Sequence, residues 1–228
     1  MFTMPLTVVL CGGKGLRLRP VTETIPKPLI KVNGRPIIDY IIDGLQTFGL
    51  HDVVLLGGYR HNQLIEHFKK NSRINVLDTG DVDIARRLEA VVSLVDDYAL
   101  VLYGDTLSDV NLDALRTEFE QDPSKTLVAV WPLKSSFGIF DVGPDGIVIS
   151  YLEKPRLEKW INIGYLCIPK AHLLSLPKFP SFELFLRGLV ELGQLRAFRH
   201  EGVHVTINTQ QELQDAEQFL MRAPGEQG

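Results

Sequence analysis

The chain has 228 residues, of which 45% are hydrophobic and 23% charged, and this composition is typical of a globular protein that buries a full core. A net charge of -4 argues against a broad nucleic-acid surface, which needs clustered Lys and Arg. The longest apolar runs are far shorter than the roughly 20 residues of a membrane helix, and the first residues lack a signal-peptide pattern. The two cysteines, Cys11 and Cys167, give no disulfide framework. We therefore expect a cytoplasmic protein that binds neither nucleic acid nor membrane.

Apolar runs alternate with helical repeats along most of the chain. This alternation predicts a Rossmann-like, three-layer α/β/α fold with a mostly parallel mixed sheet. The turn signal Gly143-Pro144-Asp145-Gly146 predicts a β-hairpin excursion between 138–142 and 146–149. We expect one domain over 1–222 and a disordered tail over 223–228. The predicted strands are 6–10, 52–56, 74–77, 98–103, 126–131, 162–168 and 195–198, and the predicted helices are 36–48, 62–70, 82–94, 112–120, 182–192 and 209–221.

A glycine-rich turn follows the first strand directly, at Gly12, Gly13 and Gly15. Backbone N–H groups in such a turn can approach phosphate oxygens without a Cβ in the way. The spacing matches neither the dinucleotide fingerprint of dehydrogenases nor the P-loop motif. Four cations lie within fourteen residues of the turn and could hold a triphosphate, although a plain tight turn with solvated cations is the alternative reading. They are Lys14, Arg17, Arg19 and Lys27.

A single carboxylate, Asp105, comes just beyond the buried run 99–103. It is placed at the carboxyl end of a predicted sheet strand, where open α/β sheets bind their ligands. One carboxylate together with phosphate oxygens and water is a common way to hold Mg2+. The alternative is a helix cap, but Asp109 or Asn111 is better placed for that role.

Several of these segments resemble the signatures of sugar-phosphate nucleotidyltransferases. The glycine turn and its continuation over 10–20 resemble the family's Gly-Gly-x-Gly-Thr-Arg-Leu-x-Pro, and Pro26-Lys27-Pro28 follows at the expected distance. Further segments stand in the family's order at 32–38, 103–105, 153–155 and 162–164, so the resemblance covers residues 6 to about 220. It implies the nucleotide-diphospho-sugar transferase fold. It also implies an activity in which a nucleoside triphosphate and a sugar 1-phosphate give a nucleoside-diphosphate sugar and pyrophosphate.

The resemblance assigns roles to individual residues, because phosphoryl chemistry depends on positioning and charge neutralisation. Arg17 would hold the β and γ phosphates, Lys27 would lie near the α phosphate, Asp105 would hold Mg2+ and Lys154 would bind the acceptor phosphate, which makes these four the catalytic candidates. The remaining candidates are Leu10, Gly12, Gly13, Lys14, Gly15, Thr79, Gly80 and Gly104 for the nucleotide, and Gly138, Glu153, Lys154 and Asn162 for the acceptor.

Two positions depart from the family pattern. Leu16 replaces a Thr, which removes one hydroxyl near the phosphates, and Asn208 stands where the family has its second metal-binding Asp. An amide oxygen can still coordinate Mg2+, so Asp105 and Asn208 are the expected metal ligands.

The nucleotide is indicated by Asp78-Thr79-Gly80 followed by Arg87-Leu88, which resembles the cytidylyltransferase branch and favours CTP. Guanylyl-, uridylyl- and thymidylyltransferases of the same family are the alternatives, together with a non-catalytic regulatory relative. A homo-oligomer is expected by analogy.

Overall fold

The computed structural model describes residues 4–221, and the tail expected at 223–228 lies outside this range. A seven-stranded sheet has the order β12-β8-β11-β6-β1-β4-β5. β11 runs antiparallel to β6 and β8, and the remaining neighbours are parallel. The predicted mostly parallel mixed sheet is therefore confirmed. Its strands are β1 (Leu6–Leu10), β4 (Val53–Gly57), β5 (Ile74–Asp78), β6 (Tyr98–Tyr103), β8 (Thr126–Lys134), β11 (Arg156–Pro169) and β12 (Leu195–Arg199).

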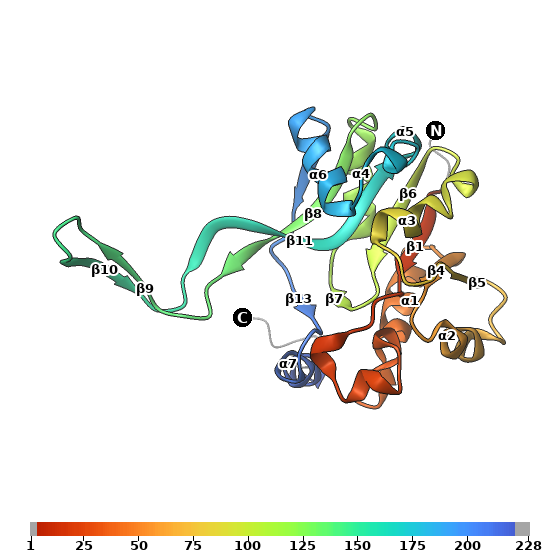
Figure 1. The fold of residues 1–228 in the computed structure, drawn as a ribbon, viewed down its shortest axis with the longest axis horizontal. Coiled ribbons are helices and arrows are strands. Elements are labelled where there is room, and N and C mark those ends of the chain that lie inside the picture. The colour runs from red at the N-terminus through yellow and green to blue at the C-terminus, as the bar shows by residue number, and fades with distance from the viewer. Residues whose placement is uncertain (1–3, 222–228) are drawn as a thin grey trace.

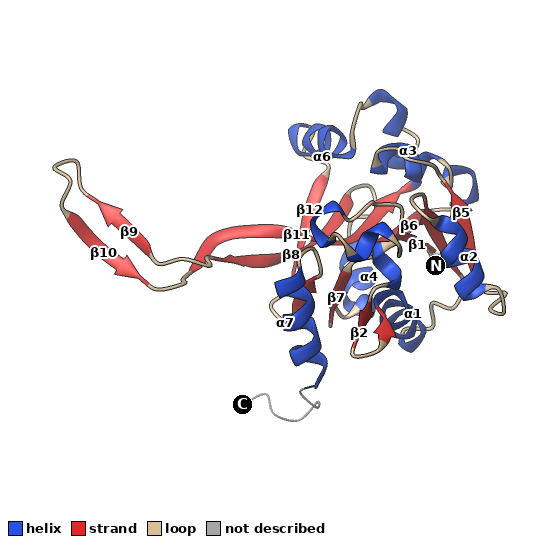
Figure 2. Cartoon of the chain, turned by 60° about the horizontal axis from the view of Figure 1, so that its bottom comes forward, coloured by secondary structure: helices blue, strands red, loops and turns tan. Residues whose placement is uncertain are grey.

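Helices cover both faces of this sheet (Figure 1, Figure 2). Successive residues of a strand point to opposite faces, so the neighbours Val8 and Val9 enter two different hydrophobic cores. The core around Val9 is covered by α1 (Ile37–Thr47), α2 (His61–Phe68) and α4 (Leu112–Glu120). The core around Val8 is covered by α3 (Ile84–Glu89), α5 (Lys170–Leu173) and α6 (Phe182–Glu191). This arrangement gives the three layers that the sequence predicted. Among the described helices, none is long and apolar enough to cross a membrane.

Several elements differ from their predicted bounds. The strands predicted at 126–131 and 162–168 are longer and cover Thr126–Lys134 and Arg156–Pro169. The predicted helix over 82–94 is divided into α3 and a 3-10 turn at Val92–Leu94. It begins late because the carboxylate of Asp83 caps it by accepting a hydrogen bond from Ala85 N at 2.9 Å. The hairpin strand expected at 146–149 instead covers Val148–Leu152, because Gly143 N donates to the carbonyl of Ile147 at 2.8 Å and the turn extends to that residue.

β8 and β11 run on beyond the other strands and lead into the hairpin formed by β9 (Ile139–Val142) and β10 (Val148–Leu152). Both views show this hairpin projecting from the body of the molecule (Figure 1, Figure 2). We call residues 137–152 the arm. Its base is braced where Ser135 N donates to the Pro155 carbonyl at 2.9 Å.

Short strands that the sequence did not predict connect the C-terminal segment to the sheet. β7 (Thr106–Ser108) follows Asp105 directly and pairs antiparallel with β13 (His204–Thr206). Ile207 N then donates to the Asp105 carbonyl at 3.0 Å, so the start of α7 (Gln210–Met221) lies beside the end of β6. The remaining small elements are β2 (Lys31–Val32), β3 (Arg35–Pro36) and the 3-10 turns Leu16–Leu18, Val21–Glu23, Lys27–Leu29 and Leu176–Lys178.

Candidate active site

A cavity of about 660 Å³ opens at the carboxyl ends of β1 and β6. This is the edge at which α/β sheets bind ligands, because the loops that follow the parallel strands converge there. The cavity brings together predicted nucleotide and metal candidates from four separate parts of the sequence. Its lining includes residues 10–17, 27–28, 81–84, 87, 103–105 and 208.

The glycine turn forms one wall of the cavity. Gly15 has φ +60°, and a Cβ there would lie 2.9 Å from Thr22 Cγ2, so this position favours glycine on both counts. Thr22 Oγ1 donates to the Gly15 carbonyl at 2.9 Å and holds the turn. Within residues 4–221, the backbone N–H groups of Gly13, Lys14 and Gly15 make no turn or loop hydrogen bond. The turn therefore offers free donors to an anion.

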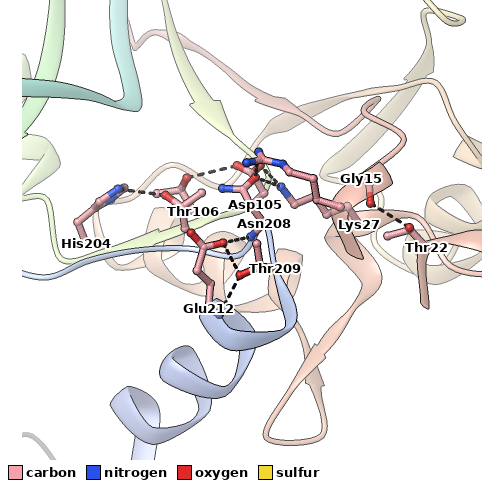
Figure 3. Close-up of polar contacts among 11 residues, drawn as sticks. Gly15, Thr22, Lys27, Asp105, Thr106, His204, Asn208, Thr209 and Glu212 are labelled. Atoms are coloured by element: carbon pink, nitrogen blue, oxygen red, sulfur yellow. Dashed lines mark hydrogen bonds and ion pairs between the residues drawn. The ribbon is translucent and has the colours of Figure 1, made fainter. Parts of the chain in front are cut away.

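A charged cluster formed by Arg17, Lys27 and Asp105 together with the amide of Asn208 lies beside this turn. Lys27, Asp105 and Asn208 are labelled in Figure 3. The ammonium of Lys27 contacts the Asp105 carboxylate and donates to Asn208 Oδ1 at 2.8 Å. Arg17 donates to the same amide oxygen at 3.0 Å. The Lys27 side chain is only 11% exposed, whereas that of Asp105 is 26% exposed. The structure thus places all four sequence-predicted residues within hydrogen-bonding distance of a neighbour in the cluster.

The start of α7 fixes Asn208. Glu212 accepts from Asn208 N at 2.8 Å, and Glu212 N donates to Thr209 Oγ1 at 3.2 Å (Figure 3). This reciprocal arrangement is a form of the capping box, with its Glu reaching back one residue further than usual. Because the backbone on both sides of Asn208 is fixed, its amide oxygen is held toward the two cations. The Thr-x-x-Glu pattern at 209–212 is a signal from which this cap could have been predicted.

The donor set at this cluster suits Mg2+. In the structure the Lys27 ammonium contacts both the Asp105 and the Asn208 oxygens, so these two oxygens already converge on one cationic group. Among the described residues there is no cluster of three or more His, Cys, Asp or Glu that could hold a metal by itself. A site with one carboxylate and one amide matches an ion that takes its other ligands from water and substrate phosphates.

Arg87 is a cavity residue that the sequence analysis used only as a marker of the cytidylyltransferase branch and did not include among the site residues. It is 4% exposed, and its guanidinium donates to the carbonyls of Gly57 (2.8 Å) and Gly12 (3.2 Å) and to Thr79 Oγ1 (2.6 Å). A Cβ on Gly12 would lie 1.8 Å from Arg87 Nη1, and one on Gly58 would lie 2.5 Å from it. Burial lowers the pKa of Arg87, but from so high an ordinary value that the group stays charged.

The other nucleotide candidates differ in how they relate to the cavity. Leu10 and Gly104 line the cavity, and a Cβ on Gly104 would lie 2.7 Å from the Leu10 carbonyl. Thr79 Oγ1 accepts a hydrogen bond from Arg87, and neither Thr79 nor Gly80 is part of the cavity lining. Lys14 forms an ion pair with Asp81 across the cavity mouth, with both side chains largely exposed.

Two neutral groups complete the wall. Burial, reinforced by Asp105, raises the pKa of Cys11, so this thiol stays protonated and is not a nucleophile. Burial likewise raises the pKa of Tyr103, whose hydroxyl accepts a hydrogen bond from Asn162 Nδ2 at 3.3 Å.

The acceptor candidates are not all gathered in this cavity. Asn162 reaches it only through Tyr103, and its Oδ1 accepts from Gly164 N at 2.8 Å. Gly138 and Glu153 lie together on the arm and its base, since a Cβ on Gly138 would lie 2.9 Å from Glu153 Oε2. Lys154, which has φ +46°, follows them in the turn between β10 and β11. None of Gly138, Glu153 and Lys154 lines the described cavity.

Comparison with known proteins agrees with this geometry. The family model described as Nucleotidyl transferase matches residues 6–178. The protein named "Probable glucose-1-phosphate cytidylyltransferase" of Bacillus subtilis strain 168 is 30% identical, over 90% of this chain and 92% of its own length. Bifunctional protein GlmU of Methanococcus maripaludis strain C5 is 31% identical over 86% of this chain, which spans about half (49%) of GlmU.

Among solved structures, HddC from Yersinia pseudotuberculosis, complexed with GMP-PN, superposes with a TM-score of 0.74 over 95% of this chain and 100% of HddC. At 21% identity this match speaks for the fold alone. The family model spans the glycine turn, the Lys27–Asp105 pair and the β10–β11 turn. The chain therefore belongs to the nucleotidyl transferase family and is a sugar-1-phosphate nucleotidylyltransferase.

Proposed function

We propose that the protein transfers the cytidylyl group of CTP to a sugar 1-phosphate, with Mg2+ at Asp105 and Asn208. An oxygen of the sugar phosphate attacks the α-phosphorus, the bond to the bridging oxygen breaks and pyrophosphate leaves. The observation that carries the choice of base is the buried Arg87 guanidinium on the cavity wall. The 30% identity to the Bacillus subtilis protein named as a cytidylyltransferase supports the same choice.

The phosphates are assigned to the glycine turn and the charged cluster. The free N–H groups of Gly13, Lys14 and Gly15 and the exposed fork of Arg17 suit the β and γ phosphates, which become the leaving group. Lys27 is buried between the turn and Asp105, a position suited to the α-phosphate. Bound Mg2+ would neutralise phosphate charge, and Asp105 and Asn208 would hold it. Positioning and charge neutralisation of this kind are the main contributions a protein makes to phosphoryl transfer.

Arg87 is suited to read the base. Its guanidinium carries five N–H donors, and within the described part of the chain three hydrogen bonds, to Gly57, Thr79 and Gly12, engage it. Donors therefore remain for a ligand in the cavity. Cytosine presents its ring N3 and carbonyl O2 as adjacent acceptors, whereas uracil carries a hydrogen on N3 that would face the guanidinium. A good bidentate contact is worth about 1–3 kcal/mol of discrimination between bases.

The acceptor would bind between the cavity and the base of the arm. Asn162 contacts the cavity residue Tyr103, and Lys154 follows Glu153 where the arm returns to β11. We assign the sugar hydroxyls to Glu153 and Asn162, and the acceptor phosphate to Lys154.

The experiment is a pyrophosphate-release assay with Mg2+, in which CTP, UTP, dTTP, GTP and ATP are each paired with several sugar 1-phosphates. We expect kcat/KM for CTP to exceed that for UTP by at least tenfold, and Arg87→Lys to narrow that ratio. A protein that uses UTP or dTTP as well as CTP would contradict the base assignment. Preference for GTP would favour guanylyl transfer instead, the second candidate, which is supported by a Campylobacter jejuni relative named as a guanylyltransferase and 28% identical over 79% of this chain.

The metal assignment has its own test. If Asn208 is a ligand, Asn208→Asp adds a negative charge beside Asp105, and we expect half-maximal activity at a several-fold lower Mg2+ concentration. Lys27 must be retained in this variant because it also contacts Asn208. An unchanged Mg2+ titration would place the second ligand elsewhere.

A further inference from the structure

The loop between Arg17 and Lys27 is held from outside by one short segment. This segment, residues 58–63, joins β4 to α2 and does not line the described cavity. Three successive carbonyls of the loop, at residues 22–24, each accept a hydrogen bond from it. The bonds run from Tyr59 Oη to Thr22 (3.0 Å), from the Arg60 guanidinium to Glu23, and from Gln63 Nε2 to Thr24 (2.8 Å). We call Tyr59, Arg60 and Gln63 the bracket.

Tyr59 is connected to both ends of the glycine turn. Its backbone N–H donates to the Gly12 carbonyl at 3.3 Å, where the turn starts. Its hydroxyl holds Thr22, whose own hydroxyl donates to the Gly15 carbonyl at 2.9 Å, where the turn ends (Figure 3). Thr22 is only 2% exposed, so this second connection is shielded from solvent. The free N–H groups of the turn therefore lie between two carbonyls that Tyr59 holds, one directly and one through Thr22.

The bracket is itself fixed in place. Arg60 has φ +55°, a left-handed conformation that is unfavourable for a residue with a side chain. Two hydrogen bonds hold it there, because its Nε donates to Tyr59 Oη at 2.9 Å and its guanidinium also donates to the Glu23 carbonyl. Residues in such conformations persist where their surroundings fix them, and they cluster at functional sites. The segment between β4 and α2 thus does more than connect a strand to a helix.

We propose that Tyr59 is a positioning residue for the triphosphate, acting through Thr22 and the glycine turn without touching the nucleotide. The inference rests on the proposed function, in which the turn and Arg17 bind the β and γ phosphates. Backbone N–H groups bind an anion together only when they point to the same place. A turn that becomes ordered only on binding loses affinity, and a turn that is ordered beforehand does not. The bracket supplies that order before the nucleotide arrives.

The test removes one hydroxyl. Tyr59→Phe abolishes the bond to the Thr22 carbonyl and keeps the ring and the backbone N–H. One hydrogen bond changes an equilibrium constant by about three- to tenfold, and we expect the KM for the nucleoside triphosphate to rise by that factor. The kcat and the KM for the sugar phosphate should stay within twofold of wild type. Inorganic tripolyphosphate, which has the phosphates without the base, should lose affinity by the same factor in calorimetry.

Tyr40→Phe is the matched control. The Tyr40 hydroxyl also donates to a loop carbonyl, that of Val32, at 3.0 Å, and Tyr40 does not line the described active-site cavity. The same atom and the same kind of bond are lost, so thermal melting should show a similar loss of stability in both variants. The KM for the triphosphate should nevertheless stay within twofold of wild type in Tyr40→Phe. Gln63→Met, which removes the bond to the Thr24 carbonyl, should raise this KM in the same direction as Tyr59→Phe.

The outcomes separate this inference from the proposed function. A Tyr59→Phe protein that folds and keeps both the KM for the triphosphate and the affinity for tripolyphosphate within twofold of wild type would overturn it. Equal losses in Tyr40→Phe would also overturn it, because they would show a general effect of lower stability. If wild type releases no pyrophosphate with any triphosphate, the proposed function is wrong, and the tripolyphosphate titration still decides the role of Tyr59. Absence of tripolyphosphate binding to wild type would overturn the inference.

Discussion

Replacing Lys27 with Met removes one positive charge from the centre of the site and keeps most of the apolar stem. The Lys27 ammonium is almost fully enclosed and donates to Asn208 Oδ1 at 2.8 Å beside the Asp105 carboxylate. For a phosphate oxygen about 4 Å away, at an effective dielectric constant near 20, Coulomb's law gives about 4 kcal/mol. Removing one preorganised donor from a developing oxyanion costs a comparable amount, about 10²–10³ in kcat. We therefore expect kcat/KM to fall by about 10²–10³.

The assay is steady-state pyrophosphate release under saturating Mg2+, with Lys31→Met as the control. Lys31 is an exposed lysine of β2 outside the cavity, so its replacement makes the same change in net charge without touching the site. Lys31→Met should stay within twofold of wild type. Circular dichroism and thermal melting establish that both variants fold. If Lys27→Met folds and retains more than a tenth of the wild-type kcat/KM, the role assigned to this lysine is wrong.

The variant Gly12→Ala would place a Cβ 1.8 Å from the Arg87 guanidinium, whereas the control Gly13→Ala places a Cβ with nothing within 4 Å. Nucleotide affinity, measured by calorimetry, should therefore fall at least tenfold more in Gly12→Ala than in Gly13→Ala. The variant Thr209→Ala removes the cap of α7 and should lower the free energy of unfolding by about 1 kcal/mol in a urea titration. It should also raise the Mg2+ concentration needed for half-maximal activity, because the cap positions Asn208. If neither quantity changes, Thr209 does not position Asn208. Burial lowers the pKa of His204 to about 4, with its Nδ1 lacking a partner in the described structure. Between pH 6.5 and 4, His204 is protonated in the unfolded chain and neutral in the folded chain. The free energy of unfolding should therefore fall by on the order of 3 kcal/mol as the pH drops through this range. In His204→Gln the free energy of unfolding should depend less steeply on pH.

Most of the fold was predictable because its signals are local. The buried strand β1 is an apolar run that ends in glycines, and α1 shows a clear helical repeat. The helix and hairpin boundaries that differed depended on side-chain caps and turns, such as Asp83 at the start of α3. The strands β8 and β11 are longer than predicted because they continue to pair with each other beyond the rest of the sheet. The short strands β7 and β13 carry almost no local signal, because each is stabilised by pairing with a segment about a hundred residues away.

In the candidate site, too, residues with a local sequence signal were predictable and residues placed by distant contacts were not. Lys27 and Asp105 were predictable from motifs and from the position of Asp105 after a buried strand. The importance of Arg87 depends on a helix that brings its guanidinium against two glycine turns from distant segments, and no local pattern encodes that contact. The direction of the arm could not be predicted either. Its turn signal indicates a hairpin, but only the pairing of the long strands β8 and β11 sets where that hairpin points.

The proposed transfer of a cytidylyl group from CTP to a sugar 1-phosphate can be followed with labelled nucleotide. The most direct measurement incubates the protein and Mg2+ with CTP labelled at either the α or the γ phosphate, adds the sugar 1-phosphate that supports turnover, and separates the products. Attack at the α-phosphorus predicts that the α label appears in a sugar nucleotide and the γ label in pyrophosphate. Recovery of the γ label in the sugar product, or of the α label in free CMP without sugar nucleotide, would contradict the account.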